Sequence, residues 1–147
     1  MNLKANELRI QNLVLCSPIE TPQFIATIEE IGEKKARIKE CKQDPIIGYL
    51  EYDFISPIQL TDEWFLRFGL HKDNYGIFEW VKDGGEYCSG CVVEFWVKRC
   101  FIDDEWVFDV SVGSDFANTV NFCYVKYVHQ FQNVFHSKTG QELETTP

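Results

Sequence analysis

The pattern with the clearest chemical content is the segment Cys88-Ser89-Gly90-Cys91, in which two thiols three positions apart flank a turn. Two thiolates at this spacing can supply half of a tetrahedral zinc site. Weak candidates for the other half are Cys100, Cys41 and His71. There is no second CxxC and no histidine pair at ligand spacing in a loop, and a thioredoxin-type redox motif needs a helix where residues 92–97 continue as a strand pattern. The sequence therefore favours reduced cysteines, no metal and no cofactor.

A row of basic residues is the second pattern. Lys35, Arg37 and Lys39 alternate with apolar residues, so on a strand all three side chains point to one face, with Lys34 and Lys42 near its ends. Such a row can bind an anion, and small barrels bind nucleic acid with basic faces and aromatic residues. The alternative is a solvated strand face neutralised by neighbouring carboxylates, which the acidic composition favours. Nucleic-acid binding stays as the alternative function.

Other groups of polar residues give weaker indications of function. His129, Asn133 and His136 share one face of an expected helix, a geometry that suits a metal or proton transfer, but a polar, solvent-facing helix surface is favoured. Asp103 and Asp104 lie in an acidic stretch that lacks the alternating ligands and glycine of a calcium loop, so a solvated hairpin turn is expected there. No serine has a nucleophile-elbow setting and no phosphate-binding glycine pattern occurs. We expect that the protein is not an enzyme.

Composition bounds the class of protein. The chain has 147 residues, of which 45% are hydrophobic and 15% aromatic, enough for one domain with a real core. Fourteen basic against 23 acidic residues give a net charge of −9, which disfavours nucleic acid and anionic membranes as partners. Residues 43–125 supply the negative excess, with five basic and fifteen acidic side chains. No signal-peptide core or membrane-spanning run is seen, so we expect a cytoplasmic protein.

Alternating apolar and polar residues predict a β-rich chain. The expected strands cover residues 13–16, 23–31, 35–41, 47–54, 77–82, 91–101, 106–112 and 119–125. Turn residues between the last four predict an antiparallel meander. A short helix is expected after Thr61, whose hydroxyl would cap it, and before Gly69. A second, amphipathic helix is expected over residues 126–137, with Gly140 as its stop.

Three stretches of the chain are familiar together. They are residues 5–14 (ANELRIQNLV), 57–70 (PIQLTDEWFLRFGL) and 127–143, which contains YVHQFQNVF and TGQEL. Their order resembles a group of uncharacterised small proteins encoded in prophages and conjugative elements of gut Bacteroidetes. That group usually has glycine where this chain has Gln11, which weighs against a tight turn there. The resemblance implies a cytoplasmic accessory protein of a mobile element and carries over no site residue.

These observations predict a single α+β domain over residues 1–147. It would have a β-rich antiparallel body, a short central helix and a C-terminal amphipathic helix, and residues 1–55 look like a small-barrel subregion of the SH3-like kind. The predicted function is that of a non-enzymatic protein-binding or adaptor module whose protein partner is unknown. Trp80 and Trp96 fall in strands with two apolar faces and would form the partner patch if one face is exposed.

Overall fold

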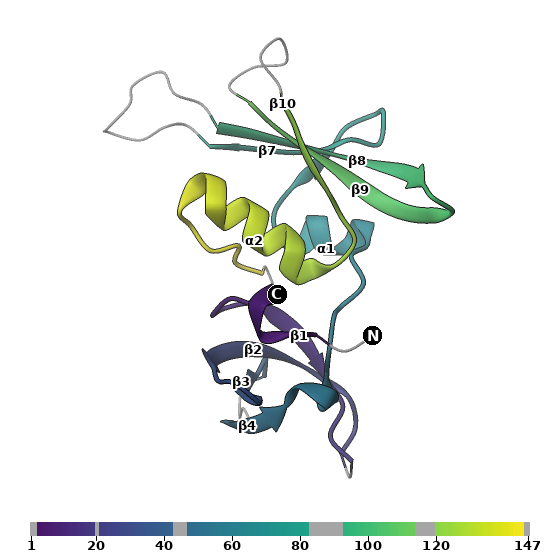
Figure 1. Ribbon diagram of the computed structural model, residues 1–147. Coiled ribbons are helices and arrows are strands. Elements are labelled where there is room, and N and C mark those ends of the chain that lie inside the picture. Colours follow the sequence, from purple (N-terminus) through teal and green to yellow (C-terminus); the bar gives the residue numbers. More distant parts are fainter. Residues whose placement is uncertain (1–2, 20, 43–46, 83–92, 114–119, 146–147) are drawn as a thin grey trace. The chain divides into compact units, whose positions relative to one another are not determined.

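The computed structural model describes residues 3–19, 21–42, 47–82, 93–113 and 120–145. These residues form two compact units, each with its own antiparallel sheet. Unit 1 comprises Met1–Gln59 and Tyr127–Glu142, and unit 2 comprises Leu60–Lys126 and Leu143–Pro147. The expected α+β architecture with antiparallel strands and a C-terminal helix is confirmed, and the strands form two antiparallel sheets (Figure 1).

The sheet of unit 1 has the strand order β4-β3-β2-β1-β5. Its strands are β1 (Leu13–Cys16), β2 (Phe24–Ile31), β3 (Lys35–Glu40), β4 (Ile47–Glu51) and β5 (Ile55–Ser56), with 3-10 turns η1 (Ala5–Glu7) and η2 (Tyr52–Phe54). The predicted alternation holds along β3, where exposed and buried residues follow one another strictly. The buried alternate residues Ala36 and Ile38 join Val14, Ala26 and Ile28 in one apolar core.

The SH3-like barrel expected over residues 1–55 is not confirmed as a closed barrel. Among the described strands, β4 pairs only with β3 and β5 only with β1, so the sheet has two edges. The strand predicted over 47–54 ends at Glu51, where η2 turns the chain, and β5 is only two residues long. The turn η2 therefore separates the two edge strands, β4 and β5, which do not pair with each other.

The turn before β1 forms despite the lack of glycine. Gln11 has φ 74°, a left-handed conformation that non-glycine residues adopt at a cost. The turn is held because the Gln11 N–H donates to the Ile28 carbonyl at 2.8 Å and the Ile28 N–H donates to the Asn12 carbonyl at 2.9 Å. These bonds extend the β1–β2 ladder beyond the strand itself, and a turn forms at Gln11 although the glycine that weighed in favour of one is lacking.

The sheet of unit 2 is the expected meander, in the order β10-β9-β8-β7-β6. Its strands are β6 (His71–Lys72), β7 (Phe78–Lys82), β8 (Val93–Ile102), β9 (Glu105–Gly113) and β10 (Val120–Val125). Ile102 pairs with Glu105, and Asp103 and Asp104 have φ 49° and 63°, so they form the predicted tight acidic turn. The β8–β9 hairpin is the longest pair of strands in the described chain.

Helix α1 (Asp62–Arg67) covers part of this sheet. The Phe65 ring lies 4.9 Å from the Phe78 ring and 4.8 Å from the Phe108 ring, edge to face in the second case. Thr61 is the N-cap residue, but its hydroxyl donates to the Glu63 carboxylate at 2.7 Å and makes no cap hydrogen bond, which corrects the predicted hydroxyl cap. Gly69 ends the helix as predicted, with φ 78°.

Helix α2 (Val128–Thr139) belongs to unit 1 and contacts β1. Its predicted stop is confirmed, since Gly140 is left-handed with φ 66° and its N–H donates to the His136 carbonyl at 2.8 Å. Val128, Phe131 and Phe135 are buried, as the helical periodicity predicts. Its polar side differs from the prediction, because His129 and Gln132 are also buried, each with 2% of its surface exposed.

Candidate functional site

The basic row lies where the sequence placed it. Lys35, Arg37 and Lys39 are exposed on one face of β3. In the register with β4 they lie opposite Glu51, Tyr49 and Ile47. Tyr49 and Ile47 are about half exposed, at 54% and 49%. The face therefore combines three cations with an aromatic and an aliphatic side chain on neighbouring strands.

Carboxylates accompany these cations. The Arg37 guanidinium lies 3.6 Å from the Glu29 carboxylate, and the Lys42 ammonium lies 2.7 Å from the Glu40 carboxylate. The Lys35 ammonium lies 4.7 Å from the centre of the Tyr49 ring. Four basic residues on this face and its margin (Lys35, Arg37, Lys39, Lys42) are matched in number by Glu29, Glu30, Glu40 and Glu51. The face consequently has no net positive charge with which to attract a phosphate backbone.

Tyr49 is held in place on this face. Its hydroxyl donates to the Glu30 carboxylate at 2.9 Å, and this bond is the main cause of its raised pKa. The Lys35 ammonium above the ring restrains it from another direction. An exposed ring fixed by two neighbours loses little rotamer freedom when a partner covers it.

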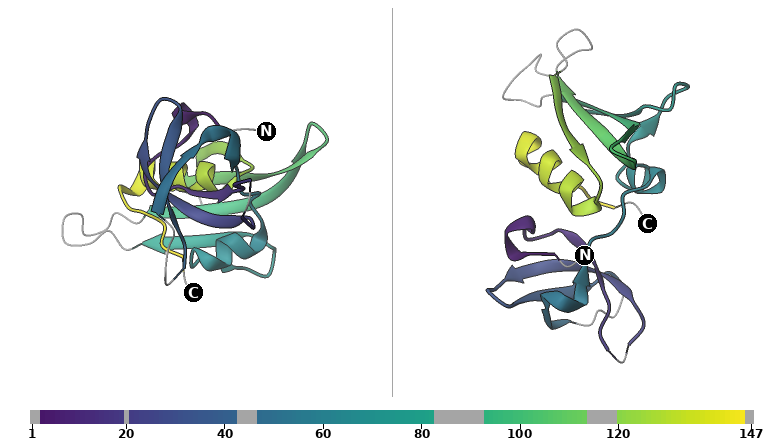
Figure 2. Two further views of the ribbon diagram at one scale, coloured as in Figure 1. Left: turned by 90° about the horizontal axis from the view of Figure 1, so that it is seen from below. Right: turned by 45° about the vertical axis from the view of Figure 1, so that its right-hand side comes forward.

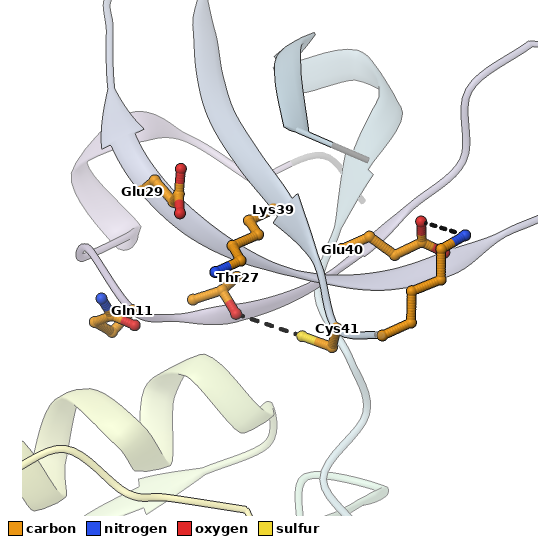
Figure 3. A pocket seen from close by; sticks show the side chains of 7 residues that line it. Gln11, Thr27, Glu29, Lys39, Glu40 and Cys41 are labelled. Atoms are coloured by element: carbon orange, nitrogen blue, oxygen red, sulfur yellow. Dashed lines mark hydrogen bonds and ion pairs between the residues drawn. The ribbon is translucent and has the colours of Figure 1, made fainter. Parts of the chain in front are cut away.

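An open hollow adjoins the row at its Lys39 end. It has a volume of about 520 Å³ and is lined by Gln11, Thr27, Glu29, Lys39, Glu40, Cys41 and Lys42. Thr27 and Lys39 are register partners on β2 and β3, and the Thr27 hydroxyl and the Cys41 thiol are 3.4 Å apart (Figure 3). Polar and charged residues line the hollow, and Gln11 and Cys41 extend it beyond the predicted row.

Neither tryptophan of the predicted partner patch is exposed. Trp96 is buried, with 6% of its surface exposed, and Trp80 is half-buried with its ring edge to face with Phe95 at 5.8 Å. Phe95 itself is fully buried. These rings therefore belong to the interior packing of unit 2 more than to its surface.

A pair of exposed aromatic side chains of unit 2 lies instead at the end of the β8–β9 hairpin. Phe101 and Trp106 are paired in register and are 55% and 53% exposed. Their ring centres are 5.1 Å apart, and the Arg99 guanidinium lies 4.4 Å from the centre of the Trp106 ring. Figure 2 shows the end of this hairpin extending away from the rest of its sheet. We call Arg99, Phe101 and Trp106 the hairpin cluster.

The hairpin cluster continues the face of the sheet that α1 covers. Arg99 pairs with Phe108, and Phe108 packs against Phe65 of α1. Phe101 and Trp106 follow two residues further along the hairpin on the same face, where their exposure shows that this covering has ended. Neither aromatic residue was predicted as a binding residue from the sequence. Phe101 and Trp106 lie one residue outside the two-residue turn, and this was the available signal that they lie at a hairpin end.

Cys88 and Cys91 lie outside the described residues. Cys100, the weak third candidate for a metal, is half-buried, and its thiol lies 3.7 Å from the Val107 carbonyl. Burial raises the pKa of Cys100, and it raises the pKa of the fully buried Cys16 to about 12. Both thiols are therefore protonated and unreactive at neutral pH. Within the described ranges, no three His, Cys, Asp or Glu side chains are grouped so as to hold a metal ion.

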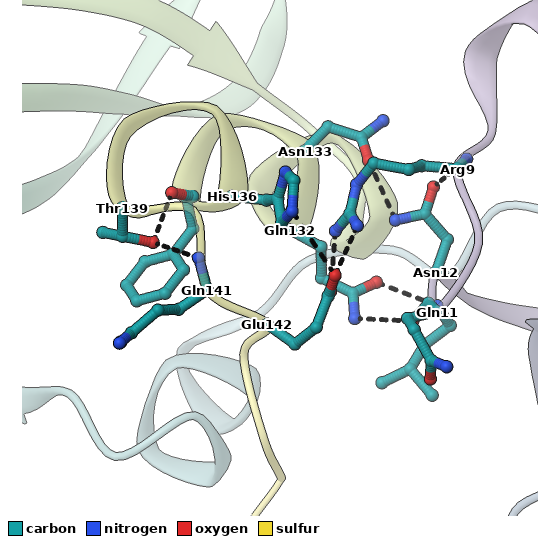
Figure 4. Close-up of polar contacts among 11 residues, drawn as sticks. Arg9, Gln11, Asn12, Gln132, Asn133, His136, Thr139, Gln141 and Glu142 are labelled. Atoms are coloured by element: carbon teal, nitrogen blue, oxygen red, sulfur yellow. Dashed lines mark hydrogen bonds and ion pairs between the residues drawn. The ribbon is translucent and has the colours of Figure 1, made fainter.

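Two residues on the polar side of α2, Gln132 and Asn133, tether the helix to the segment that leads into β1. The Gln132 side-chain oxygen accepts from the Leu13 N–H at 2.8 Å, and its nitrogen donates to the Gln11 carbonyl at 3.4 Å. The Asn12 amide, fully buried, donates to the Asn133 side-chain oxygen at 2.9 Å (Figure 4). These contacts correct the expectation that Asn133 and its neighbours face water. Helical periodicity did not predict these contacts, because buried side-chain amides can be satisfied by backbone groups of a neighbouring segment.

His129 is also buried, contrary to expectation, and its ring stacks on Tyr127 at 5.9 Å. Its Nδ1 has no hydrogen-bond partner, and burial lowers its pKa, so the imidazole is neutral at pH 7. Only His136 keeps partial exposure, with its Nε2 3.6 Å from the Glu142 carboxylate. The two histidines therefore do not form a shared site.

Unit 1 also contains an ion pair between Arg9 and Glu142. Arg9 holds the Glu142 carboxylate with both terminal nitrogens, at 2.5 and 2.8 Å (Figure 4). The hydrogen bonds from Arg9 are the main reason that the pKa of Glu142 is lowered. The contact joins the N-terminal segment to the residues after α2, and so serves the same tether.

A scan against protein-family models finds no match, and searches of the curated proteins and of the solved structures find none either. None of the helices in the described part of the chain has the length and apolar character needed to cross a bilayer.

Proposed function

We propose that this chain is a non-enzymatic protein-binding module, a cytoplasmic accessory or adaptor protein of a prophage or other mobile element, and that the hairpin cluster is its contact surface. The single observation that carries the proposal is the exposure of Phe101 and Trp106 on a hairpin end, with Arg99 stacked on Trp106. Tryptophan and arginine are the residues most enriched among those that dominate binding energy at protein interfaces.

The cluster is prepared for binding. The ring–ring and cation–ring contacts hold its three side chains on a paired strand ribbon, so a partner that covers them orders few new rotamers. The acidic turn residues Asp103 and Asp104 flank the apolar surface as a polar rim. A partner with an apolar pocket and basic margins fits this surface.

The test is capture from cells that carry the mobile element, using the full chain and two matched variants. Trp106→Ser removes the centre of the cluster, whereas Tyr75→Ser removes an aromatic that is 90% exposed and lies elsewhere on unit 2. A specific partner should be retained by the wild type and by Tyr75→Ser, and lost with Trp106→Ser. Equal retention by all three proteins contradicts the proposed surface.

A finer fold assignment supports the adaptor role. The order β4-β3-β2-β1-β5, with η2 between β4 and β5, is similar to an open form of the SH3-like arrangement, and we include this likeness in the proposal. A solved structure in which β5 does not border β1 would remove it.

Nucleic-acid binding by the row of Lys35, Arg37 and Lys39 is the second candidate, favoured by the exposure of all three side chains beside Tyr49. The matching carboxylates oppose it, as does the overall charge of −9. A gel shift with DNA and RNA at about 0.15 M salt is decisive, because charge screening is then physiological. Micromolar binding that is abolished by reversing these three charges would put this candidate first.

A further inference from the structure

The outer edge of unit 1 has features of a peptide-binding strand. Within the described residues, β4 pairs with β3 alone, and none of its backbone groups bonds to another segment. Alternate N–H and C=O groups of an edge strand point away from its neighbour and are free to pair with an added strand. Ile47 and Tyr49, exposed on one face of β4, would flank such a strand with apolar surface.

The charges beside this edge favour an acidic ligand. Among the described side chains, no carboxylate lies within ion-pair distance of Lys35 or Lys39, whereas Arg37 is paired with Glu29. Lys39 lies opposite Ile47 in the β3–β4 register, and its side chain lines the hollow beside Thr27, its register partner on β2. At the other end Glu51 lies opposite Lys35 and opposes a second acidic residue there.

We infer that β4 binds an extended peptide segment by strand addition, with an acidic residue of the peptide directed to Lys39 and an apolar residue two positions away covering Tyr49. The spacing agrees with an extended chain, in which residues two apart point to one face about 7 Å from each other. Main-chain hydrogen bonds supply affinity in this mode, and the alternate side chains supply specificity. The site is distinct from the hairpin cluster, which lies in unit 2.

An extended peptide suits this face better than a nucleic acid does. The equal numbers of lysine or arginine and glutamate produce no long-range positive field, so recognition depends on single short-range contacts. A peptide carboxylate can approach Lys39 alone, whereas a phosphate backbone would bring further negative charges towards Glu29 and Glu51. Nucleic acid is therefore an outcome of the test and not part of the proposal.

The experiment titrates the full ¹⁵N-labelled chain with a fluorescein-labelled peptide, Thr-Glu-Thr-Val-Thr-Val-Thr, in about 0.15 M salt. We expect a dissociation constant on the order of 100 µM or tighter, with amide shifts concentrated in residues 47–51. Replacing the peptide glutamate by lysine should weaken binding about tenfold, and N-methylation of alternate peptide amides should abolish it.

Protein variants separate this site from others. Lys39→Glu should weaken peptide binding about five- to tenfold, and Lys39→Gln should weaken it by a smaller factor. Lys34→Glu, an exposed charge in the neighbouring turn, and Trp106→Ser should each change it less than twofold. The inference is overturned if the lysine peptide binds equally well, if N-methylation has no effect, if the shifts lie outside 47–51, or if a twelve-nucleotide oligo(dT) binds more tightly than the peptide. Trp106→Ser tests the hairpin proposal independently.

Discussion

Replacing Gln132 by Met tests the tether between α2 and β1 most directly. Methionine keeps the unbranched shape and the helix preference of glutamine, but it removes the side-chain oxygen that accepts from the Leu13 N–H at 2.8 Å. Gln132 is 2% exposed and Leu13 is 8% exposed, so water cannot readily replace that acceptor. The variant therefore leaves a buried backbone donor unsatisfied.

The expected loss in the free energy of unfolding follows from that donor. An unsatisfied buried N–H costs about 1–3 kcal/mol, and the weaker 3.4 Å bond to the Gln11 carbonyl adds little. Urea melts should give a difference in this range for Gln132→Met, and less than about 0.5 kcal/mol for the exposed control Ser137→Ala. Hydrogen exchange should show that the Leu13 amide loses protection. Equal stability of both variants, with the Leu13 amide still protected, would refute the tether.

Four further predictions concern unit 1. Phe131→Ala should lower the free energy of unfolding by about 3–5 kcal/mol in urea melts, because the ring is fully buried. Asn133→Ala should lower it by about 1–3 kcal/mol, because it leaves the buried Asn12 amide unpaired. A loss below about 0.5 kcal/mol in either variant would contradict the packing. Gln11→Gly should raise stability by about 0.5–1 kcal/mol, since glycine relieves a φ of 74°, whereas Gln11→Ala should not; a thermal melt that ranks them in reverse argues against strain at this turn. Burial lowers the pKa of His129 in the folded chain below the 6.5 of the unfolded chain, so the folded state binds fewer protons. The contribution of this group to stability is therefore complete above about pH 6.5 and is lost as the pH drops below it. The loss is at most about 1.4 kcal/mol per pH unit. Melts between pH 5 and 8 on the wild type and on His129→Gln check this, and the same slope in both would exclude His129 as the cause.

Strands were predictable from the sequence where alternation is long enough to be seen. The β1 bounds agree with the prediction, and those of β2, β3 and β7 differ by one residue at one end. β5 and β6 were missed, since two residues contain no period to detect. Helix ends were found where glycine must adopt a left-handed conformation, at Gly69 and Gly140.

The candidate sites depend on what covers a face, and alternation alone does not contain that information. The exposure of Lys35, Arg37 and Lys39 followed from strand geometry. The exposure of Phe101 and Trp106 depends on where the covering by α1 ends, which is a tertiary property. The burial of Gln132 and His129 was not predictable either, because it depends on contacts made with segments far away in the chain.

The chain leaves unit 1 at Gln59 and returns at Tyr127, and these two residues are bridged to each other. Hydrogen bonds on both sides of this bridge, from Leu60 to Lys126 and from Val128 to Ile58, bring the outgoing and returning segments together. During synthesis at about 5–20 residues per second, the first five strands leave the ribosome several seconds before α2 does. Until then the Leu13 N–H and the Asn12 amide lack their acceptors on α2. Unit 1 is therefore complete only after α2 has been translated, although all five strands of its sheet leave the ribosome earlier.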